Sequence, residues 1–352
     1  MAAGTSLVTI DGGHGEGGGT LLRCALAMSA LTEQPVRVVD ARGGTRYPGL
    51  DPEDVTIIGA LAESTAAETV GVEPGSDSFS FRPSRPAKGI SGRIASTRNE
   101  SNRGPNALIV LNTLLPILTR SGVYCSIVAE GETYGSNSIG YDAFANHTLA
   151  ALKKLGLYAY ADLRVAGFGR ESNGEVAMDV EPSYLEGVDW ASRGSLREVA
   201  GVVATSHVRH DVADRAFAHL HTLAKQTNVR LELEHAQVES PNPGCYITLW
   251  ARYERGFGGG AAMGARSVRV ETLAQTAFEQ LIDWMASDGC LDPFLADQIL
   301  IPCVIAEGGS TFSVSRLTPR FLTAVWVVKQ FTPIHITIRG AENQPGMVSI
   351  RK

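Results

Sequence analysis

The sequence predicts an α/β (α+β) protein in which a small domain is inserted into a larger one. Strand-like and helix-like segments alternate along the chain, a pattern typical of α/β and α+β architectures. Thirty-eight glycines separate these segments. Of the 352 residues, 44% are apolar and 19% are charged, which is sufficient to bury a sizeable core. This length suits one large domain with an insertion, or two domains.

Apolar spacing predicts the elements of the first half of the chain in order. The predicted strands are residues 7–11, 36–40, 78–82, 123–129 and 175–180, and the predicted helices are 20–31, 55–66, 106–121 and 143–155.

A compact β-α-β-β pattern then follows, and it predicts the inserted domain. Its strands are residues 196–204, 230–235 and 245–253, and its helix is 212–226. The glycine-rich segment 256–264 predicts a turn or a domain boundary. After this segment, the strand–helix alternation of the first half of the chain is predicted to continue. The predicted helices are 272–287, 294–306 and 320–330, and the predicted strands are 312–315 and 335–339. The predicted domains are 1–185 and 269–352 for the large domain and 186–268 for the insert.

Composition narrows the classes of protein. The five cysteines are scattered and form no C-x-x-C pair, so a reducing, intracellular location (cytoplasmic or nuclear) is expected rather than a disulfide framework. No apolar run approaches the ~20 residues of a membrane span, so no membrane partner is expected. We expect no secretory signal, because no basic region precedes the first apolar stretch. The net charge of −6 requires any phosphate recognition to be local.

The most informative segment is residues 10–20 (IDGGHGEGGGT), between a predicted strand and a predicted helix. Gly13, Gly15 and Gly18 match the G-x-G-x-x-G dinucleotide fingerprint. However, the Glu16 carboxylate would repel a pyrophosphate unless a cation lay between them. The alternative is a tight turn that binds no ligand.

A different interpretation uses the same residues more fully. The backbone N–H groups of Gly15, Gly17 and Gly18, with the helix N-terminus, would bind a phosphate. Glu16 would hold Mg²⁺, and Arg23, one turn into the helix, would contact the phosphate. Arg42 and Arg46 follow the second predicted strand and add guanidinium groups suited to phosphate.

A second basic stretch lies between residues 82 and 103. It contains Arg82, Arg85, Lys88, Arg93, Arg98 and Arg103 against one acid, Glu100. The stretch would suit a phosphorylated partner or be a solvated edge of the fold. Aromatic residues are almost absent there, which disfavours a platform for stacking single-stranded bases.

Five segments of the chain resemble RNA 3′-terminal phosphate cyclases, in that family's order. They are residues 11–23 (DGGHGEGGGTLLR), 41–50 (ARGGTRYPGL), 131–142 (GETYGSNSIGYD), 242–254 (NPGCYITLWARYE) and 294–302 (FLADQILIP). The resemblance implies a large domain of repeated two-helix, four-strand units, related to the enolpyruvyl transferase fold, with a small inserted α/β domain. It also implies a ligase-class enzyme of RNA processing that binds ATP and Mg²⁺ (or Mn²⁺). The enzyme would convert an RNA 3′-phosphate to a 2′,3′-cyclic phosphate.

The resemblance assigns roles by position. Glu16 is the carboxylate near the metal, and Arg23 and Arg42 contact phosphate. The implied nucleotide contacts are Asn112, where the family usually has glutamine, and Phe294, Asp297 and Gln298.

One departure bears directly on the chemistry. Arg320 occupies the position of the histidine that, in the family, attacks ATP to form an adenylyl-enzyme. Arginine stays protonated and has no lone pair for that attack. Arg320 would then stabilise the transition state, and either the RNA phosphate itself or His14, beside Glu16, would attack ATP. A structural role is the alternative for His14. Thr45 also stands where the family has a second arginine.

Four further histidines cluster in the predicted insert: His207, His210, His219 and His221. They allow a zinc site, although a solvated helix face is the simpler interpretation.

Three functional hypotheses result. The leading one is a cyclase-like protein that binds nucleotide and an RNA 3′-phosphate end. The second is a catalytically silent factor of RNA processing or ribosome assembly, and the third is another phosphoryl, adenylyl or enolpyruvyl transfer on the same scaffold.

Overall fold

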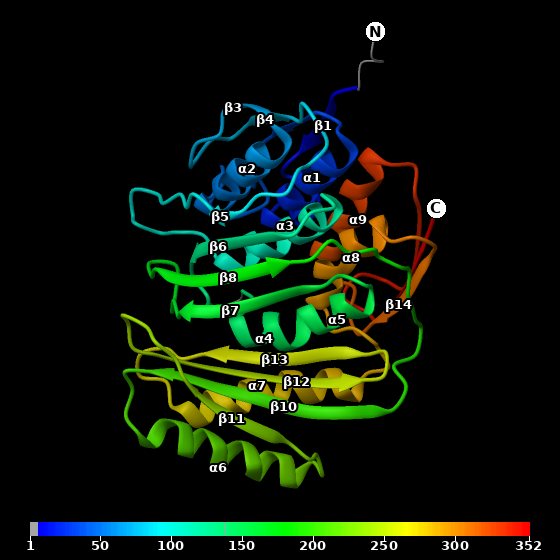
Figure 1. The fold of residues 1–352 in the computed structure, drawn as a ribbon. Coiled ribbons are helices and arrows are strands. Elements are labelled where there is room, and N and C mark those ends of the chain that lie inside the picture. Colours follow the sequence, from blue (N-terminus) through cyan, green and yellow to red (C-terminus); the bar gives the residue numbers. More distant parts are fainter. Residues whose placement is uncertain (1–5, 137) are drawn as a thin grey trace.

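The structure, a computed structural model, describes residues 6–136 and 138–352 and contains one four-strand, two-helix pattern three times (Figure 1). In each repeat the first two strands pair in parallel and the other two add antiparallel. The first repeat has the strand order β1-β2-β4-β3. Its elements are β1 (Val8–Asp11), α1 (Gly19–Thr32), β2 (Val36–Val39), α2 (Pro52–Thr65), β3 (Glu68–Val70) and β4 (Phe79–Arg82).

The second and third repeats have the same order, β5-β6-β8-β7 and β9-β14-β16-β15. The second comprises β5 (Gly92–Arg93), α3 (Ala107–Arg120), β6 (Cys125–Gly131), α4 (Tyr141–Ala143), the π-helix η1 (Phe144–Thr148), α5 (Leu149–Lys154), β7 (Ala159–Val165) and β8 (Gly174–Val180). The third comprises β9 (Asp189–Trp190), α8 (Leu295–Ile305), β14 (Ser310–Val314), α9 (Pro319–Phe331), β15 (His335–Arg339) and β16 (Gly346–Arg351).

An additional sheet is inserted between β9 and α8 of the third repeat, with strand order β11-β10-β12-β13. It contains β10 (Leu196–Ser206), α6 (Asp211–Gln226), β11 (Glu232–Gln237), β12 (Gly244–Tyr253), β13 (Phe257–Met263) and α7 (Val270–Ala286). The apolar residues of α7 share one buried cluster with α6, β10 and β12. The predicted α/β class, with repeated two-helix, four-strand units and a small inserted unit, is confirmed by this topology. The domain limits at residues 185 and 268 stay a prediction.

One predicted turn is wrong. Within the glycine-rich segment 256–264, residues Phe257–Met263 form β13, which pairs antiparallel with β12. Its glycines serve close packing by α7. A Cβ atom at Gly258 would lie 2.1 Å from the Trp284 ring, and one at Gly260 would lie 2.2 Å from the Ala277 carbonyl oxygen. Glycine is therefore required here by the neighbouring helix rather than by a turn.

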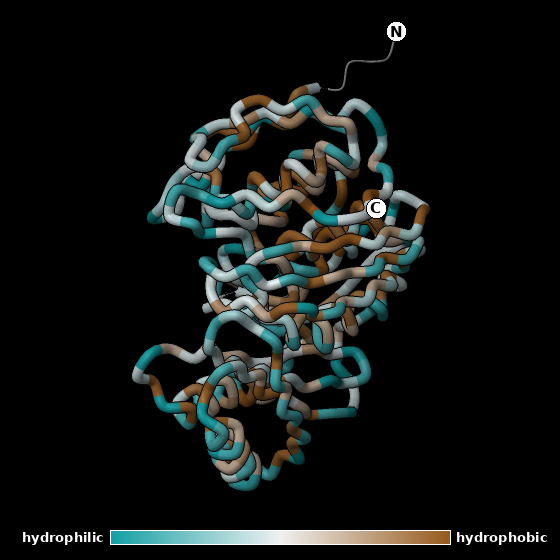
Figure 2. The backbone as a smooth tube through the Cα atoms, turned by 60° about the vertical axis from the view of Figure 1, so that its left-hand side comes forward, coloured by the Kyte–Doolittle hydropathy of each residue, from teal (hydrophilic) through white to brown (hydrophobic). Residues whose placement is uncertain are grey.

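The helices of the three repeats share one core. Helices α1, α2, α3, α8 and α9 pack on one another, and Leu21, Leu22 and Leu114 among them are fully buried. In Figure 2, many of the brown, hydrophobic stretches of the tube lie in the interior of the molecule. Each of these leucine side chains contributes about 1.5–3 kcal/mol through burial. This packing brings the start of α1, the start of α2 and the start of α9 together. In the described part of the chain, no helix combines the length and apolar character that a membrane crossing needs.

Candidate functional site

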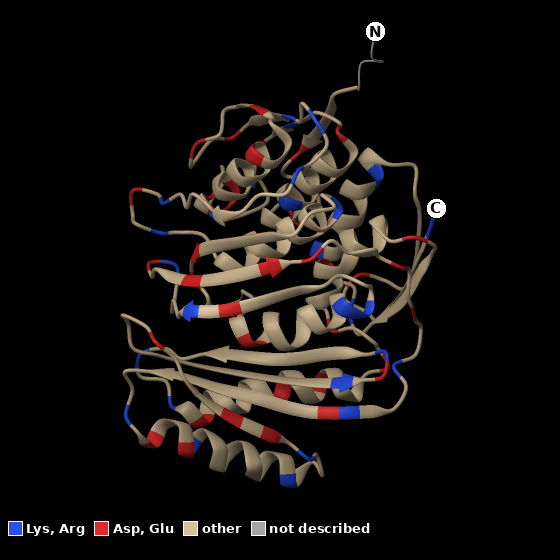
Figure 3. Cartoon of the chain, viewed as in Figure 1, with Lys and Arg blue, Asp and Glu red and all other residues tan. Residues whose placement is uncertain are grey.

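A cavity of about 720 Å³ opens where the starts of α1, α2, α3 and α9 converge. A volume of this size suits a nucleotide-sized ligand. Its lining includes the residues Glu16, Gly18, Gly19, Thr20, Arg23, Arg42, Thr45, Glu53, Arg103, Asn106, Glu132, Ser138, Arg170, Glu171 and Arg320. Figure 3 shows acidic and basic residues mixed throughout the molecule. The charged residues that line this cavity are therefore a local group.

The glycine-rich loop between β1 and α1 forms one wall. Gly17 has φ +57°, and a Cβ atom there would lie 2.7 Å from the Cα of Gly44 in the loop after β2. The backbone N–H of Glu16 donates to Thr323 Oγ1 on α9 at 2.9 Å. Two neighbouring segments therefore hold the loop in place.

The N-terminus of α1 faces this cavity. Its N-cap residue, Gly18, provides no side-chain cap, and Gly18, Gly19 and Thr20 all line the cavity. The N–H groups of a first helical turn have no partner within the helix, and together with the helix dipole they favour an anion.

Glu16 and Asp297 each carry a buried carboxylate oxygen without a hydrogen-bond partner among the described residues. Burial raises the pKa of Asp297 to about 7, against the opposing effect of the neighbouring Arg320 guanidinium. No group of three or more histidine, cysteine or acidic residues with metal-binding geometry occurs in the described residues. Mg²⁺ is commonly held by one or two carboxylates together with ligand phosphates and water, so the unpartnered Glu16 oxygen fits that role.

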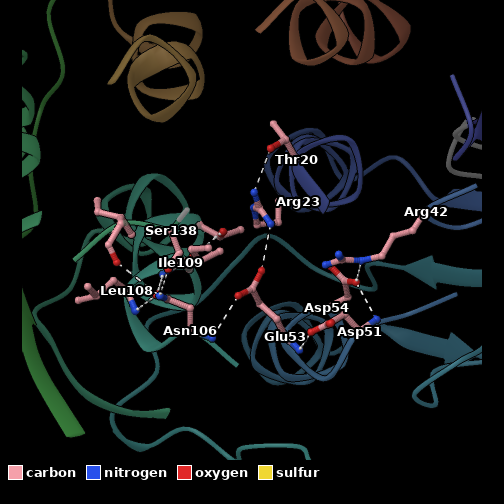
Figure 4. Close-up of polar contacts among 12 residues, drawn as sticks. Thr20, Arg23, Arg42, Asp51, Glu53, Asp54, Asn106, Leu108, Ile109 and Ser138 are labelled. Atoms are coloured by element: carbon pink, nitrogen blue, oxygen red, sulfur yellow. Dashed lines mark hydrogen bonds and ion pairs between the residues drawn. The ribbon is translucent and has the colours of Figure 1, made fainter. Parts of the chain in front are cut away.

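Two of the predicted arginines are fixed by acids of α2 (Figure 4). Arg23 donates to Glu53 Oε1 at 3.1 Å and to Thr20 Oγ1 at 3.0 Å. Arg42 binds Asp54 with two hydrogen bonds, of 2.6 and 3.1 Å. Burial opposes the charged form of Arg42, but the charge of Asp54 and these hydrogen bonds raise its pKa. Both guanidinium groups are therefore held in one orientation.

Two further arginines of the cavity lie beside a carboxylate. Arg170 binds both carboxylate oxygens of Asp51, the N-cap of α2. On α9, Arg320 Nε lies 3.8 Å from Asp297 Oδ2. Arg103, exposed at the cavity wall, has no ion pair among the described residues.

A network of polar side chains that sequence analysis missed forms the opposite wall. Asn106, the N-cap of α3, accepts from the N–H groups of Leu108 and Ile109. Its own backbone N–H donates to Glu53 Oε2, and its side-chain amide donates to Glu132 Oε2, each at 3.1 Å. An asparagine directly before an apolar helical run is a recognisable N-cap signal, but the two glutamates carried no comparable signal.

The four implied nucleotide contacts lie outside the lining of this cavity. Asn112, on α3, is half-buried, and its Oδ1 has no partner among the described residues. Phe294 is 53% exposed just before α8, and Gln298 accepts a hydrogen bond from Thr148 at 2.8 Å. Asp297 reaches the cavity region through its contact with Arg320.

His14 and Arg46 also lie outside the lining. The exposed His14 ring stacks on Trp326 of α9, with centroids 3.8 Å apart. The exposed Arg46 guanidinium lies 5.4 Å from the centroid of the Tyr47 ring. Among the basic residues of stretch 82–103, Arg103 lines the cavity, whereas Arg93 pairs with Glu130 and Glu175 on neighbouring strands.

The histidines of the insert do not gather around one point. His207 Nε2 hydrogen-bonds the Ser240 carbonyl oxygen at 2.9 Å, and His219 Nε2 lies 3.2 Å from Gln275 Oε1.

Three repeated units around a cavity of paired arginines and an open helix N-terminus define an α/β protein suited to a phosphorylated ligand. The chain belongs to the RNA 3′-terminal phosphate cyclase family, whose model matches residues 14–338. The predicted resemblance is thereby confirmed.

Three relatives, each named RNA 3′-terminal phosphate cyclase, match nearly end to end. Those of Methylococcus capsulatus and Methanopyrus kandleri are each 31% identical, over 350 and 358 residues, covering 98% of this chain and 96% and 99% of theirs. That of Thermococcus gammatolerans is 32% identical over 348 residues, covering 97% of both chains. Among solved structures, the enolpyruvyl transferase NikO from Streptomyces tendae matches with a TM-score of 0.36 and 12% identity, covering 97% of this chain and 48% of that chain.

Proposed function

We propose that this protein uses ATP and Mg²⁺ (or Mn²⁺) to convert the 3′-phosphate of an RNA end to a 2′,3′-cyclic phosphate. The observation that carries the proposal is the uncapped N-terminus of α1, which faces the same cavity as the fixed guanidinium groups of Arg23 and Arg42. Helix N–H groups and arginine forks together favour a phosphate over other anions.

In this proposal, separate residues of the cavity bind the phosphates and the cation. The N–H groups at the start of α1, with Arg23 and Arg42, hold phosphate oxygens. Glu16 holds Mg²⁺, which, when bound, offsets the charge of the phosphates. The carboxylates of Glu53 and Asp54 hold Arg23 and Arg42 in position before a ligand binds. Little ordering of these two side chains is therefore needed on binding.

The first chemical step proceeds without a covalent enzyme intermediate. By the resemblance to the family, Arg320 occupies the position of the nucleophilic histidine. His14 stacks on Trp326 outside the cavity lining. An oxygen of the RNA 3′-phosphate attacks the α-phosphorus of ATP, and the bond to the leaving pyrophosphate breaks. Arg320 stabilises the charge that develops in this step, and Asp297 orients Arg320. The remaining implied contacts, Asn112, Phe294 and Gln298, would border the nucleotide.

A silent factor of RNA processing is the second candidate. One observation favours it: carboxylates already lie beside four of the five arginines that line the cavity in the described residues. The cation that the resemblance assigns to the position of the nucleophile agrees with this candidate. A different transfer reaction on a small phosphorylated substrate remains the third hypothesis.

Turnover of a 5′-labelled RNA oligonucleotide with a 3′-phosphate tests the proposal. With ATP and Mg²⁺, we expect an end that resists phosphatase and that acid opens to a mixture of 2′- and 3′-phosphates. An Arg23→Ala variant should lose this activity, and an Arg230→Ala variant, on the exposed surface of the insert, should keep it. ATP-dependent binding without any cyclic product would favour the silent factor.

A further inference from the structure

Glu132 differs from the other acids that line the cavity. It is 5% exposed and has no ion pair with an arginine or lysine among the described residues. Glu53 uses one oxygen for Arg23 and the other for the N–H of Asn106. Glu171 is exposed. Burial of a carboxylate without a neighbouring cation costs free energy. This cost indicates a functional role for Glu132.

The orientation of Glu132 is fixed from one side. Its Oε2 accepts hydrogen bonds from the Asn106 side-chain amide and from Ser138 Oγ, both at 3.1 Å. Asn106 is itself held by hydrogen bonds with the first turn of α3 and with Glu53 (Figure 4). Oε1 has no hydrogen bond with any described residue, so it is the oxygen available to a ligand in the cavity.

This free oxygen lies at one end of a short chain of contacts. Arg23 binds Glu53, Glu53 binds Asn106 and Asn106 binds Glu132, with each hydrogen bond 3.1 Å long. The phosphate site proposed above and Glu132 are thus opposite ends of one rigid network in one cavity. In an RNA end, the 3′-phosphate and the 2′-hydroxyl are on adjacent ribose carbons. A phosphate held by Arg23 therefore places the 2′-hydroxyl in the same cavity that Glu132 lines.

We propose that Glu132 accepts the 2′-hydroxyl of the terminal ribose as a hydrogen-bond donor and removes its proton during cyclisation. This proposal rests on the proposed function. In the step, the 2′-oxygen forms a bond to the 3′-phosphorus while its proton moves to Glu132 Oε1. The bond from that phosphorus to the bridging oxygen breaks, and AMP leaves with the electron pair. In the proposed function Glu16 binds the cation, and both oxygens of Glu53 already accept hydrogen bonds. Glu132 is therefore the buried carboxylate of the cavity whose second oxygen is oriented and available.

A Glu132→Gln variant tests the proton transfer. General base catalysis contributes about 10²- to 10⁴-fold, so the variant should cyclise at least about 100-fold more slowly. It should still activate the RNA end, so an RNA with AMP joined to its 3′-phosphate should accumulate. The matched control is Glu181→Gln, an exposed acid outside the lining of the cavity, which should behave as wild type. Cyclisation by Glu132→Gln at the wild-type rate would overturn the proposal.

Binding without ATP tests the hydroxyl contact separately. Oligonucleotides with a 3′-phosphate are compared with and without the terminal 2′-hydroxyl, on wild type and on a Glu132→Ala variant whose folding is checked by thermal melting. Loss of the hydroxyl should weaken wild-type binding about tenfold and leave Glu132→Ala unaffected. An equal loss in both proteins would overturn this proposal alone. Failure of wild type to bind either 3′-phosphorylated end would overturn the proposed function with it.

Discussion

Arg320 Nε lies 3.8 Å from Asp297 Oδ2, at the start of a helix whose own N-terminus is positive. Asp297 is 9% exposed and Arg320 is 41% exposed, so a largely buried acid anchors a cation that still reaches the cavity. An ion pair at this position suits electrostatic stabilisation and has no capacity for nucleophilic attack.

Replacement of this cation by histidine tests the absence of a covalent route. Arg320→His should form an acid-labile protein–AMP adduct with α-labelled ATP, because a neutral imidazole supplies the missing lone pair. Wild type should form none. An adduct in wild type that His14→Ala abolishes would contradict the direct route and would assign the attack to His14.

The pair of Arg42 and Asp54 predicts a large effect on stability. The Asp54 side chain is fully buried and Arg42 is 16% exposed. Arg42→Ala leaves the buried Asp54 charge without a cationic partner, so it should lower the free energy of unfolding by about 3–5 kcal/mol in urea melts.

The matched variants separate charge from packing in that pair. Arg42→Ala with Asp54→Asn should recover part of the loss, because the buried charge is gone. Arg46→Ala, on the exposed part of the same loop, should leave the free energy of unfolding almost unchanged. A loss for Arg42→Ala no larger than that for Arg46→Ala would refute the interpretation.

Gly17 should tolerate no side chain. Gly17→Ala combines a positive φ of +57° with a contact of 2.7 Å between the new Cβ and the Gly44 backbone, so the loop must move. Gly122→Ala is the control, since Gly122 has φ +74° and no atom within 4 Å of such a Cβ. We expect both to lose some stability and only Gly17→Ala to lose phosphate binding, measured by titration calorimetry. Equal binding by the two variants would contradict a loop-built phosphate site.

Asp142 predicts a pH dependence of stability. Burial raises its pKa from 3.8 to about 6, although Tyr134 opposes this by donating a hydrogen bond at 2.9 Å. Because the folded protein holds this proton more tightly, the stabilisation is complete below pH 3.8 and is lost as the pH rises through about 6. Relative to wild type, Asp142→Asn should therefore gain about 2 kcal/mol between pH 4.5 and pH 8 in urea melts. A difference that stays constant across this range would show that Asp142 has an ordinary pKa.

Apolar spacing predicted the helices of the repeats and seven of the twelve strands that the structure describes in them, because such spacing is local. Strands β3, β5, β7, β9 and β16 were not predicted. Strand 335–339 agrees with β15 residue for residue, and helix 20–31 lies within α1. The turn predicted for segment 256–264 was wrong because the glycines are required for close packing against α7. This helix follows the segment in the chain and packs across the sheet.

The candidate site could be predicted only in part. Glu16, Arg23 and Arg42 are close together in sequence and share the cavity. Their partners come from other segments: Glu53 is 30 residues from Arg23, and Thr323, which accepts from the Glu16 N–H, is 307 residues from Glu16. Residue type and local spacing contain no information on such contacts.

The central claim is that the junction of β1 and α1 recognises a terminal phosphate. The most direct measurement compares the affinity of wild type for one RNA oligonucleotide ending in a 3′-phosphate and for the same RNA ending in a 3′-hydroxyl, at fixed salt. We predict that the phosphate end binds at least about tenfold more tightly, and that Arg23→Ala removes this preference. Equal affinity of wild type for the two ends would contradict the account.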